Sequence, residues 1–234
     1  MTEGADPLKL AAAQEALRLV RDGMTVGLGS GSTAELFVYL LASRVDEGGL
    51  RITAVPTSNR VGDLAGQRGI RVAALADVPR IDLAVDGADE IQSDRLDLVK
   101  GRGGALVREK LVAGAAAELC IIADSSKLVG RLGEHYAVPV AVVPFGWRQT
   151  ADRIRRLGGE PTLRLAGTGP LVTDDSLYIL DCAFGPIDDP ARLAADLKST
   201  LGVVEHGLFL GLARRAIVAG TDGVVIREPG KVVA

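Results

Sequence analysis

Apolar positions in the first part of the chain follow two alternating spacings. Between residues 7 and 20 they recur at helical spacing, which predicts a helix with Asp6 as its N-cap and Pro7 in its first position. The positions expected to face the core are Leu10, Ala13, Leu17 and Val20. Beyond this helix, short and continuous apolar runs alternate with further helical patterns, and such runs predict buried strands.

The predicted strands of this part cover residues 24–28, 50–55, 70–73, 81–85, 96–99 and 119–123. Helices are predicted from residue 34, after residue 59 and from about residue 105. Strands that alternate with helices indicate a mostly parallel sheet. We therefore predict an α/β fold with a Rossmann-like domain, whose ligands would bind beyond the carboxyl ends of the strands.

The pattern changes after about residue 132 to the order β-α-β-β-α-β. This order predicts a smaller α+β domain of ferredoxin-like type, inserted at residues 132–206 and serving as a lid or in oligomerisation. The Rossmann-like domain would then comprise residues 1–131 and 207–234. Residues 214–226 have the character of a helix followed by a strand, and we expect them to rejoin the main sheet.

Composition and charge exclude several classes of protein. With 47% hydrophobic and 24% charged residues, the chain has a globular composition, and its net charge of -3 gives no general attraction to nucleic acid or anionic membranes. Apolar runs stay shorter than the roughly 18 to 20 residues of a membrane span, and no signal-peptide pattern is present. Cys120 and Cys182 lie in apolar runs without CxxC spacing. These features predict a cytoplasmic protein with reduced thiols.

A glycine-rich turn, Gly29-Ser30-Gly31-Ser32-Thr33, leads from the first predicted strand into a helix. This arrangement gathers free N–H groups at the positive end of a helix, which favours an anion and most often a phosphate. The nucleotide-binding patterns are incomplete, because no Lys-Ser/Thr pair follows and Ser32 occupies the last position of GxGxxG. Three hydroxyl groups suit a lone phosphate monoester. The alternative is that Ser32 or Thr33 merely caps the helix.

Charged residues of both signs gather between residues 86 and 110, around the turn Gly101-Arg102-Gly103-Gly104. They are Asp86, Asp89, Glu90, Lys100, Glu109 and Lys110. Charges beside a core are unfavourable unless they are paired or used, so this patch is a candidate active site. The alternative is a solvated loop with ordinary ion pairs.

Three strand ends point to one cleft. The glycine-rich turn, Asp86 and Lys127 each follow a predicted strand, and the carboxyl ends of parallel strands meet at one edge of a sheet. Lys9, at the start of the first helix, could reach toward an anion or be an ordinary exposed lysine.

The motifs VGLGSGSTA, VDGADE, KGRGGALVREK and ADSSK, in this order and spacing, resemble those of ribose-5-phosphate isomerases of the A type. The later stretches ILDCAFG and GVVEHGLF resemble the second domain of that family, so the resemblance covers nearly the whole chain. It implies an isomerase without metal or cofactor that interconverts D-ribose 5-phosphate and D-ribulose 5-phosphate in the pentose phosphate pathway. It also implies a homodimer or homotetramer.

The resemblance places the general base on Glu109, the acidic partners on Asp86 and Asp89, and the catalytic lysine on Lys100. The substrate-binding residues that it implies are Lys9, Ser30, Gly31, Ser32, Thr33, Asp86, Gly87, Ala88, Asp89, Lys100, Gly101, Arg102, Gly103, Gly104 and Lys127. Two positions depart from the usual pattern. Ser30 replaces a frequent threonine, and Arg102 interrupts a turn that is often all glycine, which questions the backbone shape of that turn.

The chemistry of aldose–ketose isomerisation requires the same kinds of group. One carboxylate, for which Glu109 is the candidate, can move a proton between neighbouring carbons. Lys100 and the N–H groups of residues 101–104 could stabilise the enediolate oxygens. Opening of the furanose ring calls for a second acid–base group, for which we select Asp86, with Asp89 orienting Lys100 or a sugar hydroxyl.

Two other functions remain open at this point. A sugar-phosphate sensor without catalysis would have little need for Glu109, and only about twenty residues precede the first strand, too few for a DNA-binding module. A coenzyme A transferase would use a glutamate nucleophile, but the hydroxyl-rich loop suits a small sugar phosphate better. His135 and His206 lack the spacing of metal ligands, so no metal site is expected.

Overall fold

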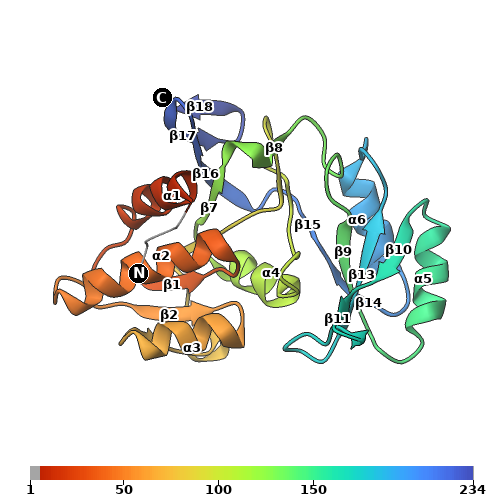
Figure 1. The fold of residues 1–234 in the computed structure, drawn as a ribbon, viewed down its shortest axis with the longest axis horizontal. Coiled ribbons are helices and arrows are strands. Elements are labelled where there is room, and N and C mark those ends of the chain that lie inside the picture. The colour runs from red at the N-terminus through yellow and green to blue at the C-terminus, as the bar shows by residue number, and fades with distance from the viewer. Residues whose placement is uncertain (1–5, 234) are drawn as a thin grey trace.

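The computed structural model describes residues 6–233, which form two lobes side by side (Figure 1). The larger lobe is built on an eight-stranded sheet. Its strands, in spatial order, are β18 (Lys231–Val233), β17 (Gly223–Glu228), β16 (Ala213–Gly220), β7 (Leu119–Asp124), β4 (Leu83–Asp86), β1 (Thr25–Leu28), β2 (Thr53–Pro56) and β3 (Arg71–Val72). From β3 to β16 all neighbours are parallel, in the 3-2-1-4-5-6 order of a Rossmann-type sheet.

Both faces of this sheet are covered. Helices α1 (Pro7–Leu17), α2 (Ser32–Asp46) and α3 (Asn59–Gln67) pack on one face, and α4 (Leu106–Ala115) packs on the other. Successive residues of a strand point to opposite faces, so Val85 joins the first core and Ala84 the second. The central strands β4 and β7 are therefore buried along their whole length.

A four-stranded sheet beside α4 completes the second face. Its strands are β15 (Leu208–Phe209), β6 (Leu98–Val99), β5 (Glu90–Gln92) and β8 (Leu128–Val129). Two single 3₁₀ turns, η1 (Leu75–Asp77) and η2 (Ser125–Lys127), connect neighbouring elements. The N–H of Asp89 donates to the carbonyl of Val99 at 2.9 Å, so that pairing places Asp89 next to Lys100 at the end of β6.

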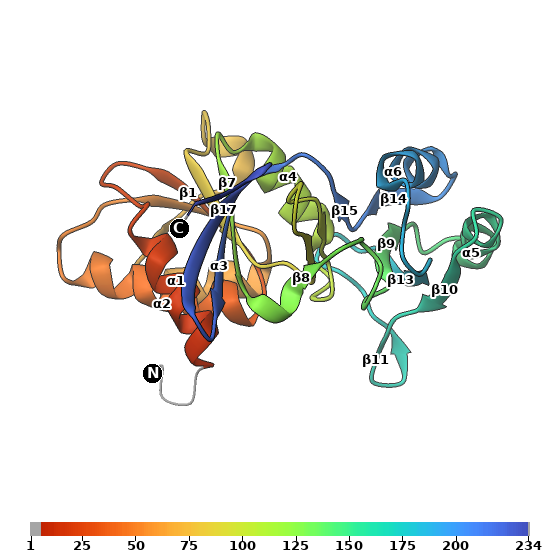
Figure 2. The same cartoon turned by 90° about the horizontal axis from the view of Figure 1, so that it is seen from above.

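The smaller lobe contains an antiparallel sheet of β10 (Glu160–Leu163), β13 (Tyr178–Ala183), β9 (Val138–Val142) and β14 (Val203–His206). A two-stranded ribbon, β11 (Leu165–Ala166) and β12 (Gly169–Pro170), extends from it. Helices α5 (Trp147–Arg155) and α6 (Pro190–Ser199) cover its outer face (Figure 2). Ala141 and Ile179, on the inner face, pack against Leu106 of α4. The small sheet thus reaches the helix that carries Glu109.

The predicted fold class is confirmed: a Rossmann-like, mostly parallel domain is combined with a smaller α+β unit in the expected β-α-β-β-α-β order. The boundaries 132–206 of the smaller domain stay a prediction. Asp6 caps α1 as predicted, accepting the N–H of Leu8 at 2.9 Å.

Two predictions about local structure were wrong in part. Of the positions expected to face the core, Ala13 and Val20 are buried and Leu17 packs against the same cluster, whereas Leu10 is only partly buried. The other buried residues of α1 are Ala12 and Ala16, because the close approach of the helix to the sheet selects small side chains. The helix expected at the start of residues 214–226 is a strand, since β16 pairs in parallel with β7 and in antiparallel with β17. Pairing with its neighbours on both sides outweighs the local preference of this segment.

Candidate active site

The glycine-rich loop after β1 and the end of β4 are in direct contact. Gly29 donates its N–H to the carbonyl of Val85 at 2.9 Å. A Cβ atom on Gly29 would lie 2.6 Å from Cα of Asp86, so only glycine permits this approach. Gly29 therefore allows the two motifs to meet at the carboxyl edge of the sheet, where open α/β sheets bind ligands.

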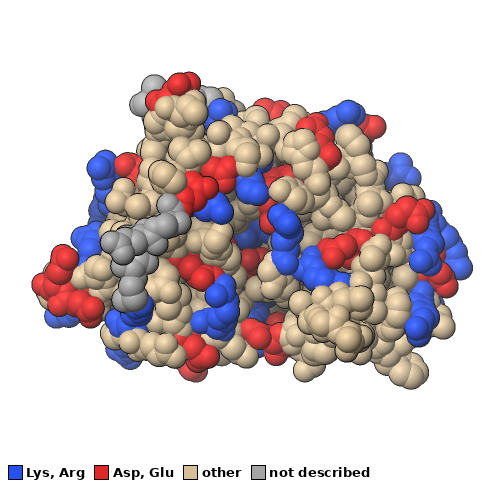
Figure 3. Space-filling view, viewed as in Figure 1, with Lys and Arg blue, Asp and Glu red and all other residues tan. Residues whose placement is uncertain are grey.

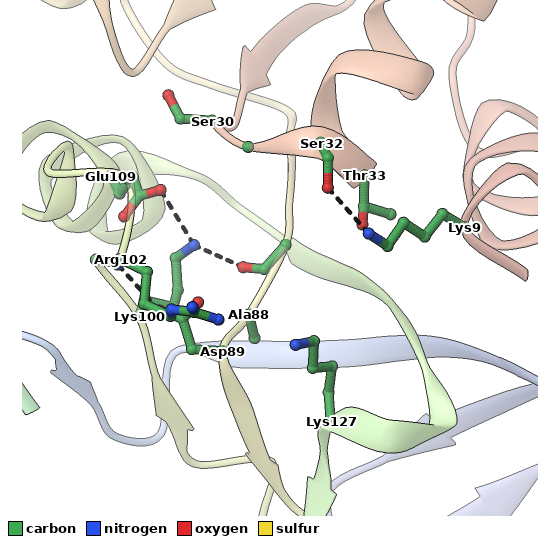
Figure 4. Close-up of a pocket in the computed structure, with 14 residues that line it drawn as sticks. Lys9, Ser30, Ser32, Thr33, Ala88, Asp89, Lys100, Arg102, Glu109 and Lys127 are labelled. Atoms are coloured by element: carbon green, nitrogen blue, oxygen red, sulfur yellow. Dashed lines mark hydrogen bonds and ion pairs between the residues drawn. The ribbon is translucent and has the colours of Figure 1, made fainter. Parts of the chain in front are cut away.

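A cavity of about 230 Å³ opens at this edge. It is lined by Lys9, Ser30, Gly31, Ser32, Thr33, Gly87, Ala88, Asp89, Lys100, Gly101, Arg102, Gly103, Glu109 and Lys127 (Figure 4). In the space-filling view, Lys and Arg side chains surround a recess near the middle of the molecule (Figure 3). All the catalytic and substrate-binding residues that the resemblance implies line the cavity except Asp86, which lies beneath it, and Gly104, which borders a neighbouring pocket.

The hydroxyl-rich end of the cavity is formed by the start of α2. Gly31 is the N-cap, at φ 103°, and Ser32 and Thr33 lie in the first turn. The alternative that Ser32 or Thr33 caps this helix is therefore wrong. Oγ of Ser32 instead accepts a hydrogen bond from Nζ of Lys9 at 3.1 Å (Figure 4). A lysine, hydroxyl groups and the N-terminus of a helix together form a suitable environment for a phosphate.

Tyr136 organises two further cations of the cavity, and no sequence motif marks this residue. Its ring centroid lies 4.4 Å from Cζ of Arg102 and 5.1 Å from Nζ of Lys127. Glu90 holds the loop that carries Tyr136, because its buried carboxylate accepts the N–H groups of Gly133, His135 and Tyr136 at 2.5, 2.6 and 2.9 Å. Glu90 therefore supports the cavity wall without lining it.

Lys100 stands at the centre of the charged cluster. Its Nζ lies 3.4 Å from Oε1 of Glu109 and donates to the carbonyl of Gly87 at 2.6 Å (Figure 4). On another side it lies 3.0 Å from Oδ2 of Asp86. All three charged side chains are 5% exposed or less. Oε2 of Glu109 is buried and has no hydrogen-bond partner among the described residues. The alternative of a solvated surface loop is therefore wrong for these three residues.

Burial sets the protonation of this cluster. It raises the pKa of Glu109 to about 8, although the Lys100 ammonium acts in the opposite direction. Burial also raises the pKa of Asp86, against the effect of Lys100. The pKa of Lys100 is raised, since the two carboxylates outweigh the effect of its own burial. One cation thus faces two buried carboxyl groups, and Glu109 can take up and release a proton near neutral pH.

The two aspartates have different surroundings. Asp86 is 3% exposed, and its Oδ1 accepts the N–H groups of Ser30 at 3.2 Å and Gly87 at 2.8 Å. Asp89 lines the cavity, and its Oδ2 accepts the N–H of Arg102 at 3.1 Å. In the turn itself the positive φ angles fall on Gly101 and Gly104, at 111° and 82°. Arg102 therefore replaces a glycine at a position where a side chain causes no backbone strain.

Lys110, although next to Glu109 in the sequence, points away from the cavity. Its Nζ donates to Oε1 of Glu205 at 2.8 Å and to the carbonyl of His206 at 2.6 Å. Burial lowers the pKa of His206 to about 4, so this histidine is neutral. Within residues 6–233 there is no group of three or more His, Cys, Asp or Glu side chains that could hold a metal ion. None of the helices described in this range is long and apolar enough to cross a membrane.

The Rossmann-like sheet, the phosphate-type loop and the buried carboxylate beside a lysine are the features expected of an α/β enzyme that moves a proton on a sugar phosphate. The model of the family described as ribose 5-phosphate isomerase A (phosphoriboisomerase A) matches residues 53–223. The chain belongs to this family, as its resemblance in sequence motifs implied.

Relatives and solved structures support this membership along the chain. Ribose-5-phosphate isomerase A of Synechococcus sp. (strain JA-3-3Ab) is 55% identical over 94% of this chain and 96% of its own length. The protein of the same name from Thermomicrobium roseum is 51% identical over 99% and 98%. The structure of ribose 5-phosphate isomerase A from Methanocaldococcus jannaschii has a TM-score of 0.91 at 39% identity, covering 97% of this chain and 100% of the other. A D-ribose-5-phosphate isomerase in complex with phospho-erythronic acid has a TM-score of 0.92 at 38% identity, covering 94% and 97%.

Proposed function

We propose that the protein interconverts D-ribose 5-phosphate and D-ribulose 5-phosphate through an enediolate, with Glu109 as general base. Family membership supports the reaction and the sugar-phosphate substrate. The observation that supports the role of Glu109 is its position in the cavity wall, 3.4 Å from the Lys100 ammonium, with a pKa raised by burial to about 8. A base with a pKa near the working pH is efficient in both directions of proton transfer.

In the proposed complex the phosphate lies at the start of α2, beside Lys9, Ser32 and Thr33. Lys127, on the same cavity, adds a second flexible cation. The reacting carbons then lie toward Glu109 and Lys100. Glu109 removes the proton next to the carbonyl and returns it to the neighbouring carbon, while Lys100 and the turn at residues 101–104 stabilise the charge on the oxygens.

We assign different roles to Asp86 and Asp89 because Asp86 lies beneath the cavity, whereas Asp89 lines it. Asp86 fixes Lys100 from beneath, so the acid–base role expected for Asp86 in ring opening would have to pass through Lys100. Asp89 faces the cavity, and we assign it a contact with a sugar hydroxyl. Orientation of Lys100 falls to Asp86, whose carboxylate lies 3.0 Å from the ammonium group.

The two alternative functions are not favoured. A sensor would derive no benefit from burying a carboxylate with a pKa of about 8 beside a lysine, because this arrangement lowers stability without contributing to affinity. A coenzyme A transferase would leave unexplained why the family model and the relatives are those of ribose 5-phosphate isomerase A.

Isomerisation in D2O with EDTA present tests the proposal. We expect the wild type to form the ketose and to incorporate deuterium at C1 or C2, as followed by NMR. Glu109→Gln should bind the substrate but lose on the order of 10²- to 10⁴-fold in turnover. Near-normal turnover of Glu109→Gln would overturn the role of Glu109. Saturable binding without conversion by the wild type would instead favour the sensor.

The wider setting is part of the same proposal. We place the enzyme in the cytoplasm and in the pentose phosphate pathway, without metal, cofactor, nucleic acid or membrane as partner. Phe145 and Leu201, on the smaller lobe, are 95% and 74% exposed. Such apolar side chains at the surface support a role of residues 132–206 in a homodimer or homotetramer.

A further inference from the structure

Arg164, in the smaller lobe, holds the glycine-containing turn of the cavity. Its Nη1 donates to the carbonyl of Gly101 at 2.9 Å and to that of Arg102 at 2.8 Å. Its Nε donates to Oδ2 of Asp181 at 2.9 Å, and its Nη2 donates to Oδ1 of the same carboxylate. The Arg164 side chain is only 14% exposed. Asp181 thus fixes the edge of the guanidinium formed by Nε and Nη2, and Nη1 binds the two carbonyls of the turn.

The alternation of the small sheet explains this placement. In β13, Leu180 and Cys182 point toward the helices of the smaller lobe, whereas Ile179 points toward α4. Asp181 shares the face of Ile179, because residues two apart lie on the same side of a strand. Arg164 directly follows β10, in which Thr162 pairs with Asp181, and its N–H donates to the carbonyl of Ile179 at 2.9 Å. Arg164 therefore lies diagonally across from Asp181 on the same face of the sheet.

The grip on the two carbonyls determines where the neighbouring N–H groups point. The described peptide bonds include no cis bond, and in a trans peptide the C=O and the N–H point in opposite directions. The N–H groups of Arg102 and Gly103 therefore point away from Arg164. That of Arg102 donates to Asp89 at 3.1 Å, and Gly103 lines the cavity.

We infer that Arg164 is a positioning residue for isomerisation, which aims the Gly103 N–H and the Asp89 carboxylate at the substrate by holding the carbonyls of the turn. The inference rests on the proposed function. Gly101 and Gly104 give the turn many accessible conformations, so donors on it are effective only if another group fixes them. Arg164 does not line the cavity and acts through the turn.

Lysine cannot replace arginine in this role. The planar guanidinium makes hydrogen bonds to two carbonyls and a bidentate pair with Asp181, whereas an ammonium group is a point donor on a flexible stem. The substitution Arg164→Lys keeps the charge and much of the volume, and so separates geometry from electrostatics. Arg155 offers a matched control, because it forms an ion pair with Asp152 in the same lobe, with side chains 49% and 61% exposed.

The test compares Arg164→Lys, Arg164→Ala and Arg155→Ala with the wild type. For each protein, kcat and KM for ribose 5-phosphate, the inhibition constant of phospho-erythronic acid and the thermal unfolding temperature are measured. We expect both Arg164 variants to lose about 10- to 100-fold in kcat with KM within about threefold, because the affected donors act mainly in the transition state. Phospho-erythronic acid, whose carboxylate resembles the enediolate end, should bind more weakly, and added guanidinium should restore part of the activity of Arg164→Ala. Arg155→Ala should behave as the wild type.

Folded Arg164 variants with the kcat and inhibition constant of Arg155→Ala would overturn the inference. If Arg164→Ala does not fold, Arg164→Lys decides by the same criterion. An inactive wild type would overturn the proposed function and this inference with it. An active wild type with unaffected Arg164 variants would overturn this inference alone.

Discussion

Nζ of Lys100 lies 3.4 Å from Oε1 of Glu109, with both side chains almost completely buried. The same ammonium group also faces Asp86, so one positive charge serves two carboxylates. When one buried ammonium group faces two buried carboxyl groups, the second negative charge is not compensated, and one of the two carboxyl groups is more easily protonated. Burial raises the pKa of Glu109, and the negative charge of Asp86 adds to this effect, so the pKa of about 8 suits a group that must accept and return a proton.

The pH dependence of kcat/KM should show this competition. Glu109 must be ionised to act as a base, and its pKa in the folded protein is about 8. We therefore expect kcat/KM to rise with pH, about tenfold per unit well below pH 8, and to level off above it. Initial rates between about pH 5.5 and 9.5 measure this limb, with Lys127→Ala as a control that should keep the same limb. A plateau extending down to the acid end of that range would contradict a raised pKa.

Replacement of Asp86 should shift the rising part of the pH profile of kcat/KM along the pH axis. The negative charge of Asp86 raises the pKa of Glu109 more than that of Asp89 does. In Asp86→Asn, Lys100 has Glu109 as its main anionic partner, so Glu109 ionises more readily and the limb shifts to lower pH. Asp89→Asn should shift it less. We also expect kcat of Asp86→Asn to fall, because Lys100 loses its anchor. An equal shift of the pH profile in both variants would show that the two aspartates affect the pKa of Glu109 equally.

The free energy of unfolding should fall as the pH rises, whereas kcat/KM rises. Glu109 has a pKa of about 8 when folded and an ordinary value of 4.5, so between these values the folded state holds a proton that the unfolded state releases. The free energy of unfolding thus loses up to about 1.4 kcal/mol per pH unit from this group as the pH rises, and the loss is complete above about pH 8. Glu109→Gln lacks this contribution and should be the more stable protein at about pH 8.5, with a smaller difference at about pH 5. Chemical denaturation at both values measures it, and a difference independent of pH would contradict the raised pKa.

The sequence predicted the strand ends and the loop because both depend on local patterns. Apolar runs that end at Leu28 and Val85 are followed by Gly29 and Asp86, and parallel strands place such ends together. How deeply each aspartate lies below the cavity could not be predicted from local patterns. That Asp86 lies beneath Lys100 while Asp89 reaches the cavity depends on the pairing of β5 with β6.

Long-range contacts account for the other features that the sequence did not reveal. Lys110 and Glu109 are adjacent, yet a helix turns neighbouring residues by about 100°, so one faces Glu205 and the other the cavity. Tyr136, on the loop between β8 and β9, and Arg164, in the smaller lobe, reach the site and carry no motif. In residues 214–226, the sheet imposed a strand where the local pattern favoured a helix.

The cations of the phosphate end should contribute to binding more than to turnover. Lys9 lines the cavity at the start of α2 and Lys127 lines it from the end of η2, and both lie apart from the Lys100–Glu109 pair (Figure 4). A charge-assisted hydrogen bond contributes roughly 1.5 to 3 kcal/mol, so Lys9→Ala and Lys127→Ala should each raise KM about 10- to 100-fold. The phosphate is bound alike in the ground state and the transition state, and kcat should therefore change little.

Steady-state kinetics and titration with inorganic phosphate measure the effects of the two lysines on KM, kcat and phosphate affinity. Lys231→Ala, an exposed lysine outside the cavity, serves as control. A fall in kcat at unchanged KM would show that these lysines act on the reacting carbons instead, and the phosphate would then have to lie elsewhere in the cavity.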